Sequence, residues 1–134
     1  MDEQNAYFGL GSGGIAAVDI RNGERKWFTF IAPAEGREKH PGQTGPLTAI
    51  PGVIFSGGFD GVLRALSASD GKIVWQFDTL REFQTVNGVE AKGGSIGAAG
   101  PVVAGGLLFV PSGYVGVQNA LPGNLLLVFA APKE

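Results

Sequence analysis

The polar residues that could do chemistry gather in one stretch, "TLREFQTVNGVEAKGGSIGAAG", residues 79–100. Lys92 carries its ammonium, and Thr85, Asn87 and Ser95 add neutral hydroxyl and amide groups. An ammonium can pair with a ligand carboxylate or polarise a carbonyl oxygen, while the neutral groups supply hydrogen bonds. These four residues are therefore candidates for a ligand-binding site. The alternative is that Lys92 is a solvated surface charge and that Asn87 only opens a turn.

Other polar residues are weaker candidates. Charged residues of the same stretch fit a solvated loop face, namely Arg81, Glu82 and Glu90. Three residues on a later loop could shape the mouth of a site, namely Tyr114, Gln118 and Asn119. Asp60 in "GGFDG" fits a turn. The single histidine, His40, lies in a loop rich in Glu, Lys and Gly, which favours exposure over metal binding.

Two short motifs match catalytic or cofactor patterns only by letter. "GLGSGG" at 9–14 matches the dinucleotide-binding pattern G-x-G-x-x-G, but "IAAVDI" follows it and reads as a strand rather than a helix. "GGSIG" at 93–97 matches the G-x-S-x-G nucleophile motif, which needs a following helix and a downstream His. The only His lies upstream. We reject both interpretations.

An internal repeat indicates the architecture. "GGIAAVDIRNGERKW" at 13–27 returns as "GVLRALSASDGKIVW" at 61–75, 48 positions later. The Asn-Gly and Asp-Gly pairs predict two-residue hairpin turns in which both central residues have positive φ. Trp27 and Trp75 hold the same place in the repeat, which favours packing between neighbouring repeats.

The repeat unit has four short strands, A to D, and a period of about 50 residues, which is typical of a β-propeller blade. In the middle copy the strands fall near 46–50, 53–57, 62–67 and 73–78. The sequence thus predicts an all-β partial propeller of two to three four-stranded antiparallel blades in one domain. The predicted parts are blade i at 5–31 without strand A, blade ii at 45–79, a crossover at 80–98, and blade iii at 99–131 without strand D.

Propeller geometry sorts the loops. Strand A lies at the axis and strand D at the rim, so A–B and C–D turns share one face, while B–C loops and D-to-A crossovers share the other. Small molecules favour concave mouths near the axis. We therefore expect the long crossover at 79–100 to carry function.

Composition excludes several classes. Of 134 residues, 44% are hydrophobic and 16% charged, which indicates a folded domain. A net charge of −2 without a basic block argues against nucleic acid and anionic membranes as partners. No apolar run reaches the roughly 18 residues of a membrane span, and the start of the chain does not read as a signal peptide. The absence of Cys excludes disulfides and thiolate zinc sites.

The segments "AVDIRNGERKW" and "ALSASDGKIVW" resemble the tryptophan-docking repeat of pyrroloquinoline quinone (PQQ) propellers, approximately A-x-D-x-x-T-G-x-x-x-W. The longer stretch from "TAIPGVIFSGGFDG" to "LPGNLLLVF" resembles the C-terminal blades of polyvinyl-alcohol-dehydrogenase-like quinoproteins. The resemblance covers residues 13–130. Two departures are a count of fewer than three blades and the lack of the Cys pair expected before "TAIPG".

The resemblance implies a periplasmic, PQQ-dependent oxidation of an alcohol, with cytochrome c as electron acceptor. PQQ carries three carboxylates and an ortho-quinone, so the resemblance makes Lys92, Asn87, Ser95 and Thr85 candidate PQQ ligands. It also implies calcium and a general base in the whole protein, and no carboxylate cluster in this sequence offers either.

Three functional interpretations follow. The leading one is the C-terminal propeller part of a PQQ-dependent alcohol dehydrogenase, which contributes an axial loop to the site. The alternatives are a non-catalytic propeller scaffold that binds protein partners, and an inactive fragment. We also expect the isolated chain to self-associate or to be poorly stable, and to bind no PQQ tightly alone, because open blade faces and edges invite pairing.

Overall fold

The computed structural model describes residues 1–37, 41–97, 99–114 and 119–132, and every regular element in this part of the chain is a β-strand. The strands are β1 (Asn5–Leu10), β2 (Gly14–Asp19), β3 (Arg25–Phe30), β4 (Thr48–Ile50), β5 (Val53–Gly57), β6 (Val62–Ser67), β7 (Ile73–Asp78), β8 (Glu82–Phe83), β9 (Ala91–Lys92), β10 (Val102–Ala104), β11 (Leu107–Ser112) and β12 (Leu125–Ala130).

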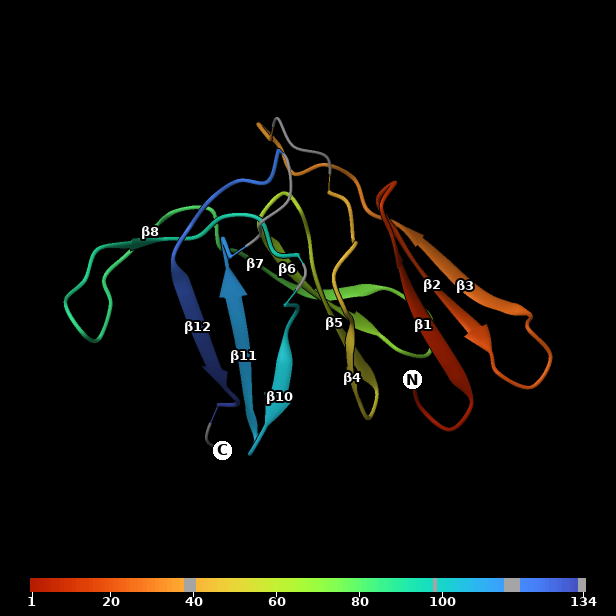
Figure 1. The fold of residues 1–134 in the computed structure, drawn as a ribbon. Coiled ribbons are helices and arrows are strands. Elements are labelled where there is room, and N and C mark those ends of the chain that lie inside the picture. The colour runs from red at the N-terminus through yellow and green to blue at the C-terminus, as the bar shows by residue number, and fades with distance from the viewer. Residues whose placement is uncertain (38–40, 98, 115–118, 133–134) are drawn as a thin grey trace.

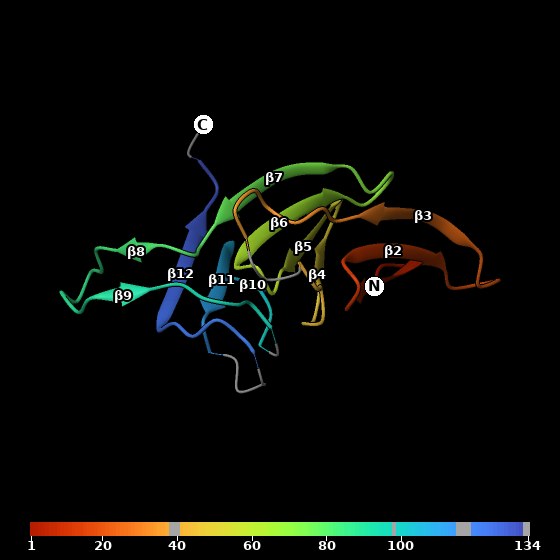
Figure 2. The same ribbon diagram turned by 90° about the horizontal axis from the view of Figure 1, so that it is seen from above.

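Three antiparallel sheets stand side by side like the sectors of a fan (Figures 1 and 2). Their strand orders are β1-β2-β3, β4-β5-β6-β7 and β10-β11-β12, so each strand pairs with its neighbour in sequence. We call them the first, middle and third sheets. Strands β5, β6 and β7 have the bounds expected for strands B, C and D, while β4 begins two residues later than expected for strand A. The inner strands β4 and β10 of adjacent sheets contact each other.

The turns after β2 and β6 differ from the expected two-residue hairpins. Gly23 and Gly71 have positive φ, at 76° and 74°, but the Asn and Asp before them do not. The predicted pair of positive φ values is therefore wrong. The loops are longer: the Gly23 N–H donates to the Asp19 carbonyl at 2.8 Å, and the Gly71 N–H donates to the Ser67 carbonyl at 2.8 Å. Beside the first turn, side-chain hydrogen bonds from Arg21 lower the pKa of Asp19 well below its usual value.

The core consists of apolar residues buried between sheets. Between the first and middle sheets, Ile15, Ile31 and Leu66 are almost fully buried. Between the middle and third sheets, Leu63 meets side chains of β11 and the returning crossover, namely Ile96, Leu108 and Val110. Hydrophobic burial between neighbouring sheets, rather than within one sheet, therefore holds the fold together.

The two tryptophans lie between sheets, as the repeat predicted. The Trp27 indole N–H donates to the Ala68 carbonyl of the middle sheet at 2.9 Å, and the ring lies over Gly71. Trp75 meets Phe129 of the third sheet edge-on, with ring centroids 5.4 Å apart. Trp75 is still 39% exposed. Trp27 is thus the more completely docked of the two.

Candidate functional site

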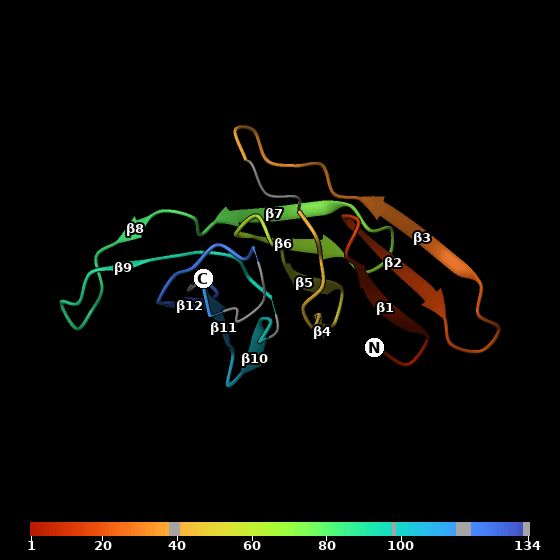
Figure 3. The same ribbon diagram turned by 45° about the horizontal axis from the view of Figure 1, so that its top comes forward.

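The crossover from β7 to β10 has two structurally different parts. Residues 79–92 form an excursion that contains the β8–β9 hairpin, in which Glu82 pairs with Lys92. This hairpin projects beyond β12, away from the inner strands β4 and β10 (Figures 2 and 3). Residues 93–97 then return between the sheets and are buried. The polar tip expected near the axis therefore lies on the outer side, and only the glycine-rich end runs inward.

Thr85 and Asn87 lie at the tip of the hairpin and bond to each other. The Thr85 hydroxyl is 2.7 Å from Asn87 Oδ1 and also contacts the Val89 carbonyl, and its single proton can serve one of these at a time. Asn87 Oδ1 accepts the Val89 N–H at 3.3 Å. These bonds make a turn, which is the alternative that the sequence left open.

Ser95 is fully buried and joins two sheets. Its hydroxyl donates to the Phe59 carbonyl at 2.6 Å and accepts the Leu121 N–H at 2.8 Å. Its own N–H donates to the Leu121 carbonyl at 2.8 Å. The side chain is thereby committed to the loop of the middle sheet on one side and to the loop before β12 on the other.

Thr79 and Ser112 form a second buried link beside it. The two hydroxyl oxygens are 2.8 Å apart, and the Thr79 hydroxyl is 2.6 Å from the Gly61 carbonyl. The Gly94 N–H donates to Ser112 Oγ at 2.9 Å. Buried polar groups need such partners, so these hydroxyls satisfy the backbone of a glycine-rich segment that runs between two sheets.

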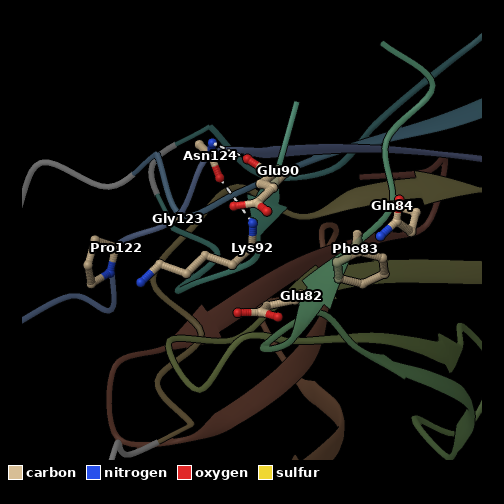
Figure 4. A pocket seen from close by; sticks show the side chains of 9 residues that line it. Glu82, Phe83, Gln84, Glu90, Lys92, Pro122, Gly123 and Asn124 are labelled. Carbon is tan, nitrogen blue, oxygen red and sulfur yellow. Dashed lines mark hydrogen bonds between the residues drawn. The ribbon is translucent and has the colours of Figure 1, made fainter. Parts of the chain in front are cut away.

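Lys92 stands in a pocket between the hairpin and the loop before β12 (Figure 4). Its backbone N–H donates to Asn124 Oδ1 at 3.0 Å, and the Asn124 amide donates to the Glu90 carbonyl at 3.3 Å. The pocket has a volume of about 780 Å³. Its lining is Glu82, Phe83, Gln84, Glu90, Ala91, Lys92, Pro122, Gly123 and Asn124. In the described part of the chain, the Lys92 ammonium has no hydrogen-bond or ion-pair partner.

A buried ion pair lies under the loop between β5 and β6. Arg64 Nη2 is 2.8 Å from Asp60 Oδ2, and both side chains are almost fully buried. Asp60 also accepts the Val62 N–H at 3.2 Å, which confirms its role in the turn. Sequence reasoning missed Arg64 as a buried partner. The signal was present as the four-residue spacing between Asp60 and Arg64 across a tight glycine turn.

The described residues do not by themselves fit PQQ. A ligand with three carboxylates needs converging cations or N–H groups. Two arginines are already paired, Arg64 with Asp60 and Arg37 with Asp78. Arg81 lies over aromatic rings, 5.0 Å from the centroid of Phe77. Among the cations of the crossover Lys92 remains, but the Glu82 and Glu90 carboxylates share its pocket. The other three predicted ligands lie elsewhere, with Thr85 and Asn87 at the hairpin tip and Ser95 buried between sheets. The four predicted ligands therefore do not converge into a cofactor site here.

Of the remaining predicted positions, Glu82 and Glu90 line this pocket, and the others lie elsewhere or outside the described residues. Arg81, Glu82 and Glu90 are exposed, as expected for a solvated loop face. Tyr114 and Asn119 are also exposed. Gln118 and His40 lie outside the described residues. Within the described ranges there is no group of three or more His, Cys, Asp or Glu side chains that could hold a metal ion, and no helix long and apolar enough to cross a membrane.

Comparisons with known proteins show what this chain resembles in sequence and in fold. No protein-family model matches the chain. A polyvinylalcohol dehydrogenase from Pseudomonas sp is 39% identical over 150 residues, which covers 96% of this chain and 23% of the relative. A polyvinylalcohol dehydrogenase from Sphingopyxis sp. (strain 113P3) is 37% identical over 134 residues, with 90% and 20% covered.

The solved structures agree. The quinohemoprotein alcohol dehydrogenase from Comamonas testosteroni superposes with a TM-score of 0.59 at 26% identity, and the match covers 83% of this chain and 16% of that structure. The chain spans about a fifth of the length of the curated relatives it matches. The predicted resemblance and fold class are confirmed: the chain is a homologue of part of polyvinylalcohol dehydrogenase and forms a partial β-propeller of the quinoprotein alcohol dehydrogenase type.

Proposed function

We propose that the chain supplies part of the propeller of a PQQ-dependent alcohol dehydrogenase that works in the periplasm and passes electrons to cytochrome c. The observation that carries this proposal is the 39% identity to polyvinylalcohol dehydrogenase across 96% of the chain. A polymeric alcohol of the polyvinyl alcohol kind is the substrate class that this similarity supports. Because the chain matches about a fifth of the relative's length, its part in that activity is a contribution to a larger ring.

Among the four candidate ligands, Lys92 is the residue that we propose for contact with PQQ. Its ammonium is exposed and unpaired within the described residues, whereas the Ser95 hydroxyl and the Thr85 and Asn87 side chains already have partners in the chain. The roles of those three as ligands stay predictions. The Glu82 and Glu90 carboxylates beside Lys92 oppose an anion, so tight binding requires further cations from elsewhere in a complete ring.

A chimera tests the proposal. The homologous segment of the Pseudomonas polyvinylalcohol dehydrogenase would be replaced by this chain, and PQQ-dependent oxidation of polyvinyl alcohol would be followed with an artificial electron acceptor. We expect activity to be retained. We expect Lys92→Ala to weaken PQQ binding by about tenfold to a hundredfold, the loss of one charge-assisted hydrogen bond.

The matched control is Lys72→Ala, which removes an exposed lysine from the turn after β6. That turn lies at the opposite end of the sheets from the crossover (Figure 1), so PQQ binding should not change. A chimera that folds and binds PQQ with Lys92→Ala as tightly as without it would remove Lys92 from the site. A folded chimera without PQQ-dependent activity would favour the non-catalytic scaffold.

A further inference from the structure

We propose that the outward face of the first sheet and the outward face of the third sheet dock on each other between two copies, so that the chain self-associates head to tail. This inference concerns assembly and does not rest on the proposed function. Each of the two sheets has one apolar face that is exposed and one face that is already buried within the chain.

The outward face of the first sheet is an exposed aromatic surface. Across the three strands, Phe8 pairs with Ala16 and Ala16 with Phe28, so these three side chains share one face. In the next row, Leu10 pairs with Gly14 and Gly14 with Phe30. Phe8, Phe28 and Phe30 are 50%, 44% and 63% exposed. Contiguous apolar patches of this kind mark interaction sites on soluble proteins.

The third sheet also has an apolar outward face. Val102 pairs with Phe109, and Phe109 pairs with Val128, which places these residues in one row. Leu126 pairs with Pro111 in the neighbouring row of the same face. Leu126, Val128 and Val102 are 58%, 50% and 50% exposed. The opposite face of this sheet, with Leu108 and its neighbours, is already buried against the middle sheet.

Strand register shows that the outward face of the third sheet matches a face that is buried elsewhere in the chain. Phe109 stands where Phe55 stands in the middle sheet, since both occupy the third residue of the second strand of a unit. Leu126 pairs with Pro111, which lies two residues after Phe109. In the same way, Leu63 pairs with Gly57, which lies two residues after Phe55. Phe55 and Leu63 pack against the third sheet.

The outward face of the first sheet corresponds to the face of the middle sheet that packs against the first sheet. In the middle sheet that face carries Leu66, which packs against Ile15 of the first sheet. Val18 stands at the Leu66 position in the first sheet, 48 residues earlier, and shares the outward face with Phe8 and Phe28. The two outward faces are therefore the two halves of an interface that the chain already forms twice internally.

A second copy of the chain carries both outward faces, and so supplies the partner for each face of the first copy. Contacts between unlike faces are heterologous, and they close into a ring when the rotation allows it. Two copies contain six sheets of the first, middle and third kind, and this number lies within the range of about four to eight blades of closed propellers. A head-to-tail pair therefore covers one first-sheet face and one third-sheet face, and it covers all four outward faces where the rotation closes the ring. Pairing of like faces would have no counterpart within the chain.

Sedimentation of the 134-residue polypeptide between about 1 and 100 µM tests the assembly, a range that brackets ordinary specific association. We expect reversible dimers. Phe30→Glu on the first face and Leu126→Glu on the third face should each raise the dissociation constant by about a hundredfold, because a carboxylate would be buried without a partner. The control is Val86→Glu on the hairpin tip, a fully exposed apolar residue outside both faces, which should leave the dimer unchanged.

Mixing distinguishes head-to-tail pairing from pairing of like faces. The Phe30→Glu chain keeps an intact third-sheet face, and the Leu126→Glu chain keeps an intact first-sheet face, so an equimolar mixture should form mixed dimers while each variant alone is monomeric. Circular dichroism would check that both variants fold. A wild-type monomer throughout the concentration range, or one variant that dimerises alone while the other does not, would overturn the proposal.

Discussion

The clearest energetic test compares two equivalent glycines, Gly71 and Gly23. Both follow the same turn pattern, and their φ values of 74° and 76° carry nearly the same strain for an alanine. That strain is about 1–2 kcal/mol. The surroundings differ: a Cβ at Gly71 would lie 2.4 Å from Trp27 Cε3 and 2.5 Å from Thr29 Oγ1, whereas a Cβ at Gly23 would meet nothing within 4 Å.

The difference between the two substitutions therefore isolates docking between the first and middle sheets. Gly71→Ala must displace the Trp27 indole, which overpacks the contact at a cost of about 1–3 kcal/mol. The displacement also weakens the hydrogen bond from the indole to the Ala68 carbonyl, at about 1 kcal/mol. We expect Gly71→Ala to lower the free energy of unfolding by about 2–4 kcal/mol more than Gly23→Ala does.

Urea unfolding followed by far-UV circular dichroism, at one low protein concentration, measures both changes. The same pair would then be made in a Trp27→Ala background. There the indole is absent and the close approach to Thr29 Oγ1 remains, so the difference between the two alanines should shrink without vanishing, as a double-mutant cycle requires for a direct contact between Trp27 and Gly71. Equal costs in the wild-type background, or an unchanged difference in the Trp27→Ala background, would refute docking of Trp27 on Gly71.

Three further outcomes are expected. Trp27→Ala should destabilise by about 3–5 kcal/mol in urea unfolding, and more than Trp75→Ala, because Trp27 is hydrogen-bonded across the interface while Trp75 is 39% exposed; equal losses would contradict this. Asp60→Ala should cost about 3–5 kcal/mol, because it leaves the Arg64 charge buried without its partner, and adding Arg64→Met should recover part of the loss; no recovery would mean that the pair is not the cause. The pKa of the Asp19 carboxyl is lowered in the folded chain, so this carboxylate stabilises the fold above the unfolded-state pKa of about 4, and its contribution is progressively lost as the pH falls below that value. Asp19→Asn should therefore lose less stability than the wild type between pH 7 and pH 3. Identical losses in the two chains would contradict the lowered pKa.

The strands of the middle sheet could be predicted because their signals are local. Alternating and β-branched apolar residues, glycine turns and the 48-residue echo all favour the same boundaries for β5, β6 and β7. The turn type could not be predicted from the Asn-Gly and Asp-Gly pairs alone. The bulge between Ala65 and Leu66, repeated between Ala17 and Val18, lengthens these loops, and a bulge depends on the register of both strands.

The placement of the crossover was harder to predict for a different reason. Its length and polarity fit a binding loop, but part of the length is used by the β8–β9 hairpin, which projects away from the inner strands (Figure 3). Two-residue strands carry almost no sequence signal. The direction of the hairpin is fixed by long-range contacts, such as the bond from the Lys92 N–H to Asn124, and no local pattern encodes these contacts.

Residue type cannot separate a ligand-binding hydroxyl from a structural one, because both tasks use the same hydrogen-bonding groups. The separation depends on whether a polar atom already has its partners inside the chain. The Ser95 hydroxyl has two partners, from two different sheets, and is buried. To bind a ligand it would have to give up bonds that hold the crossover in place, and a buried group left unpaired costs about 1–3 kcal/mol. The Lys92 ammonium carries no such cost, since it is exposed and unpaired among the described residues. Of the groups singled out in the crossover, Lys92 is therefore the one that a ligand can recruit without loosening the contacts between the sheets.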